Sequence, residues 1–384
     1  MSPTPSSSAT SSSASSPASP SLLPLPRRDF ILLPLISLLT ALLMGALAEF
    51  GSRQIWVEKA NDDCAVGGRH KANCTMLMKN IEGPWVRYET NDCGYRGTAS
   101  CGPKPAGNLR AVVMGTSVAF GLHIPYDQFF AARAAPELSK IWHHPVEVQN
   151  LGDIMPLWLN NDATLKEMAA LKPDAVFLIV APFDLSRAGG QGEEEGVVPK
   201  KANEVKTGWT WTDARLALRE SRVLYMAQHF LLNDEKFFLH AFEEYADPND
   251  ASRTPTPPLV EQRFGLMEER VAKAVEYARP AGAEVFMVAL PNRVQCALIS
   301  KGIRLPHMDP YVFNSRMKEI ALRHEVNYID LIPDLERTPN AERLFYSVDG
   351  HPAAGAHSLM ASAIVHYFRK RGGLCSTNKN GTAR

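Results

Sequence analysis

The chain has 384 residues, 45% of them hydrophobic, and its 41 basic and 41 acidic side chains give a formal net charge of zero. Length and composition are those of a globular protein with one large domain or two small ones. Nucleic-acid-binding proteins need a concentrated basic face to neutralise phosphates, and no long block of like charge occurs here. The composition therefore argues against a nucleic-acid partner.

The N-terminal part of the chain has the pattern of a membrane anchor. Residues 1–28 are mostly Ser, Pro, Ala and Thr, and we expect a disordered tail there. Residues 30–48 carry no charge and approach the roughly 20 residues of a bilayer-spanning helix. Because Arg27 and Arg28 precede this run, the tail is predicted to be cytoplasmic. A transmembrane anchor over 29–49 would then hold the rest of the chain on the periplasmic or cell-surface side.

Two other interpretations of this segment remain open. Ala46-Leu47-Ala48 has the small-x-small pattern of a signal-peptidase site, and residues 27–31 loosely resemble a twin-arginine export signal. The apolar run is longer than the usual core of a signal peptide, which favours an uncleaved anchor. All three interpretations export the domain.

The cysteines agree with an exported domain. An even number of cysteines in such a chain indicates disulfides. The first four cysteines allow three disulfide connectivities, of which 64–74 with 93–101 is the simplest. The C-x-x-C spacing that is typical of metal sites does not occur in the sequence. The six cysteines all follow the apolar run: Cys64, Cys74, Cys93, Cys101, Cys296 and Cys375.

Beyond the anchor, a loop-rich, cysteine-containing neck is expected over residues 50–107. Short apolar runs then alternate with helical patterns, which predicts an α/β fold: a doubly wound, three-layer parallel sheet of about five strands. An insertion over 185–256 lies where substrate-covering lids occur, and a flexible tail is expected over 372–384. The strands are predicted at 109–114, 146–149, 175–180, 284–290 and 326–329, and the helices at 127–138, 163–171, 213–232, 259–278, 310–323 and 353–371.

Two segments carry side chains suited to nucleophilic catalysis. Ser117 directly follows the first predicted strand, and Asp349 and His351 precede the last helix. A serine nucleophile needs a base to take its proton and a carboxylate to orient that base. Ligands bind at the carboxyl edge of such sheets, where these two loops can meet. Taken singly, Ser117 and Asp349 are equally explained as helix caps.

These segments resemble the SGNH/GDSL hydrolases. Residues 110–121 are similar to the family's first block, and residues 349–357 to its last. Residues 91–97 resemble the N-x-x-G-[YF]-R-G element that precedes the domain in membrane-anchored bacterial members. The resemblance implies a flavodoxin-like SGNH hydrolase domain over 108–371, with neither cofactor nor metal. Ser117 would be the nucleophile, His351 the base and Asp349 its orienting partner.

The chain departs from the family pattern around the oxyanion hole. Backbone N–H groups of Gly152 and Met155 are the candidate donors, but a side chain at position 155 makes close approach harder. Phe183 stands where the family has a donating Asn, and Thr116 replaces the Asp before the nucleophile. Losing one oxyanion donor costs about a hundredfold or more in rate.

Three functions follow from these patterns. The first is a serine-dependent acyl or acetyl esterase that acts on an envelope glycan or lipid through an acyl-serine intermediate. The alternatives are a glycan O-acyltransferase and a catalytically idle glycan-binding module. Trp209 and Trp211 either stack on a sugar or pack the insertion, and Arg96 either meets an anionic substrate or braces the neck.

Overall fold

The computed structural model describes residues 28–60, 63–66, 69–154, 157–188, 220–245, 247 and 250–374. The chain divides into two compact units, residues 1–51 and 52–384. Several predictions lie outside the described residues. These are residues 1–27 of the N-terminal tail, Met155, residues 189–219 of the insertion with Trp209, Trp211 and the start of the helix predicted at 213–232, and the C-terminal tail from Cys375 onward.

The predicted anchor is helical. Helix α1 covers Asp29–Ile55, and of the described helices it alone is long and apolar enough to cross a membrane. Its large apolar side chains are exposed on every side, as in Leu38 and Leu42, which a lipid-facing helix requires. The helix runs beyond the predicted end at residue 49, because the mixed polar and apolar residues 49–55 continue the intrahelical hydrogen bonds past the uncharged run.

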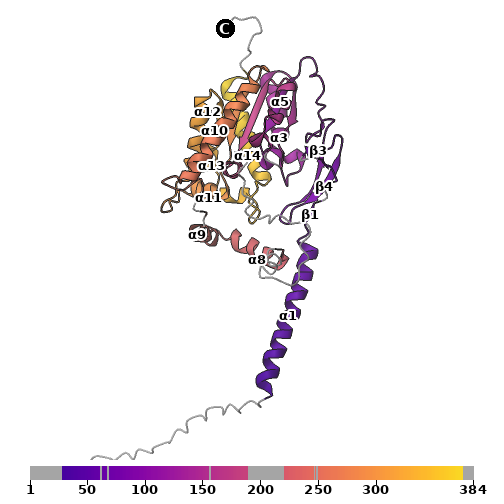
Figure 1. The fold of residues 1–384 in the computed structure, drawn as a ribbon, viewed down its shortest axis with the longest axis vertical. Coiled ribbons are helices and arrows are strands. Elements are labelled where there is room, and N and C mark those ends of the chain that lie inside the picture. The colour runs from indigo at the N-terminus through magenta and orange to yellow at the C-terminus, as the bar shows by residue number, and fades with distance from the viewer. Residues whose placement is uncertain are drawn as a thin grey trace, which may run out of the picture. The chain divides into compact units, whose positions relative to one another are not determined.

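The second unit contains the predicted parallel sheet (Figure 1). All four strand pairings are parallel, in the order β10-β9-β8-β6-β7, so the fold prediction is confirmed. The central strand β8 is buried throughout, because helices cover both faces of the sheet. The strands are β6 (Leu109–Met114), β7 (Val146–Asn150), β8 (Ala175–Val180), β9 (Glu284–Ala289) and β10 (Asn327–Ile329).

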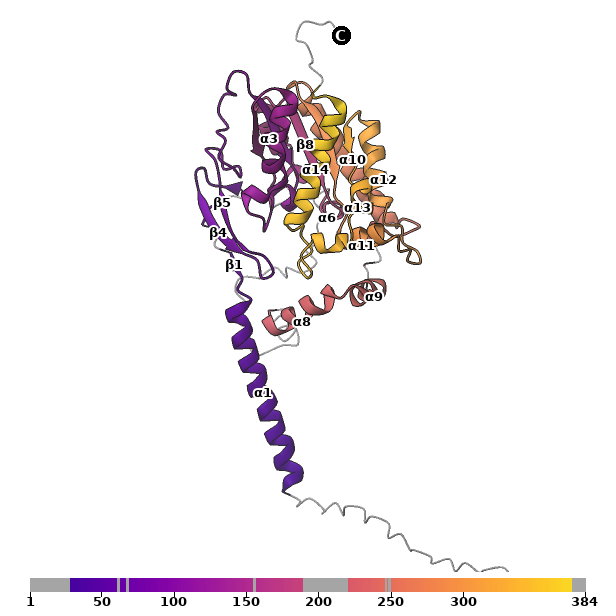
Figure 2. The same ribbon diagram turned by 180° about the vertical axis from the view of Figure 1, so that it is seen from behind.

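Alternate residues of each strand enter opposite cores, as a pleated strand requires. In β6, Ala111 and Val113 pack with α3 and α14, whereas Val112 and Met114 pack with α5, α10 and α12. The helices lie around the sheet in Figures 1 and 2. Three layers result. The predicted helices are observed as α3 (Phe130–Trp142), α5 (Ala163–Ala170), α8 (Arg222–Asn233), α10 (Pro258–Ala278), α12 (Val312–Arg323) and α14 (Ala354–Arg371).

The structure also contains elements that the sequence patterns did not predict. Several are short, from four to eleven residues, so their periodicity is weak: α2 (Ser117–Phe120), α4 (Leu157–Asn160), α6 (Pro182–Leu185), α9 (Glu235–Tyr245), α11 (Arg293–Lys301) and α13 (Ile332–Glu336). The neck is less loop-rich than expected. It holds one antiparallel sheet of β1 (Lys59–Ala60), β4 (Thr75–Lys79) and β5 (Trp85–Glu89), and the pair β2 (Ala65–Val66) and β3 (Arg69–His70).

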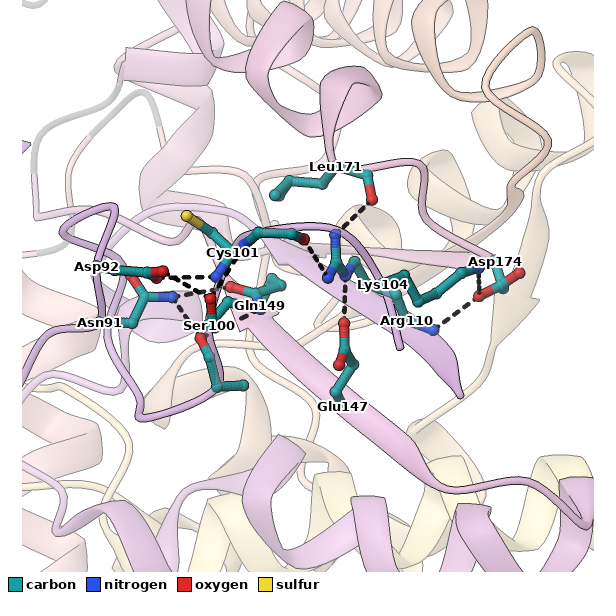
Figure 3. A network of polar contacts seen from close by, with 12 residues as sticks. Asn91, Asp92, Ser100, Cys101, Lys104, Arg110, Glu147, Gln149, Leu171 and Asp174 are labelled. Carbon is teal, nitrogen blue, oxygen red and sulfur yellow. Dashed lines mark hydrogen bonds and ion pairs between the residues drawn. The ribbon is translucent and has the colours of Figure 1, made fainter. Parts of the chain in front are cut away.

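The neck is bonded directly to the parallel sheet, both at the edge strand β7 and at the starts of β6 and β8 (Figure 3). Asn91 Nδ2 donates to Gln149 Oε1 on β7 at 2.9 Å, and the Arg110 guanidinium on β6 donates to the Gly102 carbonyl at 2.8 Å. The Lys104 ammonium lies 2.5 Å from the carboxylate of Asp174. Disulfides 64–74 and 93–101, the simplest predicted pairing, fasten the neck internally, with Cα atoms 5.9 and 6.1 Å apart.

Candidate active site

The structure brings the three predicted side chains into one hydrogen-bonded chain. The Ser117 hydroxyl donates to His351 Nε2 at 3.0 Å, and His351 Nδ1 donates to Asp349 Oδ1 at 2.6 Å. Ser117 begins α2 directly after β6, and is 5% exposed. The tight turn needs Gly115, because a Cβ there would lie 2.5 Å from Ala119 Cβ. A hydroxyl, an imidazole and a carboxylate are thus aligned for proton transfer.

Two further residues surround Asp349, and the sequence patterns did not identify them. Asn80 of the neck donates through Nδ2 to Asp349 Oδ2 at 3.1 Å and lies 3.0 Å from His123 Nε2. Burial lowers the pKa of His123 to about 4, so this imidazole is neutral and accepts from Asn80. Burial raises the pKa of Asp349, but its bonds and charge interactions with His351 outweigh that effect and leave the pKa below its usual value.

This cluster also has ligand types that bind metals. One atom each of His123, Asp349 and His351 lie within 4.8 Å of one another. Their hydrogen bonds already occupy these atoms, since Asn80 directs an amide NH₂ at two of them and His351 Nδ1–H faces Asp349. A cation would meet donor hydrogens rather than free lone pairs. The arrangement fits an acid–base pair better than a metal site.

Thr116, the residue before Ser117, has an acidic partner far away in the sequence. Its hydroxyl donates to Asp184 Oδ1 at 2.5 Å, and the Ala181 amide donates to Asp184 Oδ2 at 2.8 Å. Asp184 is completely buried, and burial raises its pKa to about 6. The carboxyl group of Asp184 therefore links Thr116, the residue before Ser117, to Ala181 in the loop that follows β8.

The elevated pKa of Asp184 predicts a pH-dependent stability. The native state binds this proton more tightly than the unfolded chain, so the stabilisation by the proton is lost as pH rises from about 4 to about 6. The pKa difference corresponds to about 3 kcal/mol. In Asp184→Asn the side-chain oxygen can still accept from the Ala181 amide while the NH₂ donates to the Thr116 hydroxyl, and the pH-dependent loss should disappear. Urea unfolding of wild type and variant from about pH 4 to about pH 7 measures it; parallel stability profiles would contradict the assignment.

Of the two predicted oxyanion donors, Met155 lies outside the described residues and Gly152 already has an acceptor. The Gly152 amide donates to Asn150 Oδ1 at 2.9 Å, and a Cβ at this position would lie 2.4 Å from the Phe120 nitrogen of α2. Glycine is therefore required for the close approach to α2. Phe183 is 54% exposed, with the Arg187 guanidinium 4.1 Å from its ring centre, and offers no donor. Among the described residues, none accepts from the Ser117 backbone N–H, which leaves it as a donor.

Arg96 braces the helix that carries Ser117. Its guanidinium donates to the carbonyls of Phe120 at 2.7 Å and Gly121 at 2.5 Å, and also to that of Ile124. The side chain is 2% exposed and lies 4.5 Å over the ring of Tyr88. Burial lowers its pKa to about 10. Of the two sequence-based alternatives, the structure favours bracing over contact with an anionic substrate.

Comparison with known proteins gives a likeness in fold. No protein-family model and no curated protein matches the chain. Similar solved structures include a lipolytic protein of the G-D-S-L family from Veillonella parvula (12% identity, 68% of this chain, 99% of that chain, TM-score 0.34). Others are a lipase/acylhydrolase from Enterococcus faecalis (12%, 68%, 96%, 0.36) and the esterase EstA from Pseudoalteromonas (10%, 68%, 97%, 0.34).

Proposed function

We propose that this chain is a serine-dependent ester hydrolase that removes acyl or acetyl groups from an envelope glycan or lipid. The observation that carries the proposal is the hydrogen-bonded chain from Ser117 through His351 to Asp349, with contacts of 3.0 and 2.6 Å. A serine that merely capped α2 would not need an imidazole on its hydroxyl and a carboxylate behind it.

The chemistry follows from the proton positions. His351 Nε2 takes the Ser117 hydroxyl proton as Oγ attacks the ester carbonyl carbon, and the Ser117 N–H stabilises the oxyanion. The alcohol then leaves with the proton from His351, and an acyl-serine remains. Water, deprotonated by His351, attacks the acyl carbon and restores Ser117. Asp349 keeps the proton on Nδ1 throughout, so that Nε2 stays free to accept.

An O-acyltransferase remains the second candidate. It would use the same acyl-serine, with a sugar hydroxyl in place of water. Among the described residues the Ser117 backbone N–H has no acceptor, and Ser117 is 5% exposed, which is compatible with a slow, shielded site that favours a bound acceptor over water. The idle binding module is less well supported, because the hydrogen-bonded chain is complete.

The substrate is proposed to lie close to a membrane. Helix α1 is long and apolar enough to cross a membrane, and such an anchor in the same chain would keep the domain at a membrane. Two disulfides support an extracytoplasmic position. Acylated lipids and glycans of the envelope meet both conditions.

Labelling with a fluorophosphonate tests the proposal. We expect mass spectrometry of the full chain in detergent to find one adduct, on Ser117, which disappears in Ser117→Ala and His351→Ala. Ser100→Ala is the control, because this serine binds Asp92 in the neck and should not affect labelling. A folded protein that gains no adduct would instead favour the binding module. If adducts form, the ratio of acyl transfer to hydrolysis on acetylated sugars separates the two enzymatic candidates.

A further inference from the structure

Glu82 is a buried acid in the neck whose carboxylate faces the loop of Asp349. Only 1% of its side chain is exposed. It accepts three consecutive backbone N–H groups: Ser347 on Oε1 at 3.1 Å, and Val348 and Asp349 on Oε2, both at 3.0 Å. Successive N–H groups that converge on one anion fix the local backbone tightly. The main chain at Asp349 is therefore held by a residue far away in sequence.

The same loop of the neck also holds the Asp349 side chain. The Glu82 amide donates to Asn80 Oδ1 at 2.9 Å, which orients Asn80 so that its Nδ2 meets Asp349 Oδ2. Residues 80–82 thus bind Asp349 in two ways: Glu82 accepts from its backbone N–H, and Asn80 donates to its carboxylate.

Glu82 has two more partners on helix α8 of the insertion. His229 Nδ1 donates to Oε1 at 2.6 Å, and the Tyr225 hydroxyl lies 3.3 Å from Oε2. On the same helix, Asn233 accepts from the Ser347 hydroxyl at 2.6 Å. The neck, the insertion and the loop before α14 therefore meet at one carboxylate.

We propose that Glu82 is a positioning residue for the Asp349–His351 pair, and that docking of α8 through His229 completes this support. The inference rests on the proposed function and assigns no chemical step to Glu82, because a side chain that is 1% exposed and bonded on both oxygens has no access to substrate. Its effect passes through Asp349 to the orientation of the imidazole.

Glu82→Gln tests this role sharply. Both carboxylate oxygens accept backbone N–H groups, so either orientation of a glutamine amide sets an NH₂ against at least one of them. We expect kcat with a 4-nitrophenyl ester and the labelling rate of Ser117 to fall tenfold to a hundredfold, with KM unchanged, because small misplacements cost about this much. Glu89→Gln is the matched control, since this half-exposed acid of β5 pairs with Arg87.

Two further measurements keep the outcomes distinct. The low-field proton resonance of His351 Nδ1–H reports its bond to Asp349 without any turnover, and it should shift in Glu82→Gln but not in Glu89→Gln. His229→Gln, which leaves the three backbone bonds intact, should slow labelling less than Glu82→Gln does.

The positioning role is overturned if Glu82→Gln is labelled at the wild-type rate and its resonance is unchanged. If Glu82→Gln does not fold, wild-type labelling of folded His229→Gln overturns the role of α8 docking, and slower labelling supports it. If wild type itself neither reacts nor hydrolyses esters while the resonance shifts in Glu82→Gln, the proposed function fails and the positioning role stands.

Discussion

Asp349→Asn is expected to lower kcat/KM for ester hydrolysis by about a thousandfold to ten-thousandfold while the protein stays folded. The carboxylate accepts from both Nδ1 and the backbone N–H of His351. An asparagine in its place would set its NH₂ either against Asn80 Nδ2, which would push the side chain away from the imidazole, or against His351 Nδ1–H, which would make the imidazole move its proton to Nε2. That nitrogen could then no longer accept the Ser117 proton. Hydrolysis of a 4-nitrophenyl ester by the full chain in detergent measures the loss.

Asp334→Asn is the control for this substitution. Asp334 is partly exposed on α13 and pairs with Arg337, so its replacement should leave the rate within about twofold, as for other surface sites. If Asp349→Asn retained wild-type activity, Asp349 would not be the partner that orients the base. The adduct on Ser117 would then need another activating arrangement.

Arg96→Met is expected to lower the free energy of unfolding by about 4 kcal/mol. Three buried carbonyls, those of Phe120, Gly121 and Ile124, would each lose a hydrogen bond to a charged donor, and such a bond contributes about 1.5–3 kcal/mol. Phe120 keeps a long contact with Asn150 Nδ2, and Gly121 keeps the backbone N–H of Ile124, which reduces the loss. Methionine keeps part of the packing against Tyr88, which limits the loss. Urea unfolding followed by tryptophan fluorescence measures the change.

Arg87→Met is the matched control in the neighbouring strand. Its side chain is 67% exposed and forms only an ion pair with Glu89, so the change should be within about 0.5 kcal/mol. Equal effects of the two substitutions would show that the carbonyls beside α2 find water or another donor when Arg96 is absent.

The parallel sheet was predictable because its strands are short, apolar and buried on both faces. The predicted and observed bounds of β6 and β8 are identical, and those of β7 differ by one residue. The sequence patterns also singled out Ser117, Asp349 and His351. Ser117 follows a predicted strand and the other two precede a predicted helix, and active sites of parallel α/β sheets lie in loops of this kind. Their roles remain predictions that the experiments above test.

The surroundings of these residues were not predictable from spacing. Asp184 and Thr116 lie 68 residues apart, and Glu82 is one acid among many with no motif around it. The roles of these residues depend on burial and on which loops come together in the fold. Neither produces a periodic pattern in the sequence. The neck strands were missed because they are two to five residues long and carry charges.

The hydrogen bonds from Asn80 and Glu82 of the neck to the loop before α14 affect the order in which the protein folds. Asn80 and Glu82 are separated from their partners by 265 to 269 residues, so synthesis produces the support long before the loop that it supports. The cysteine pairs, only 10 and 8 residues apart, can close early. The long-range contacts form last and at a large entropic cost. The reactive serine would therefore become activated only after the loop of Asp349 and His351 has been synthesised.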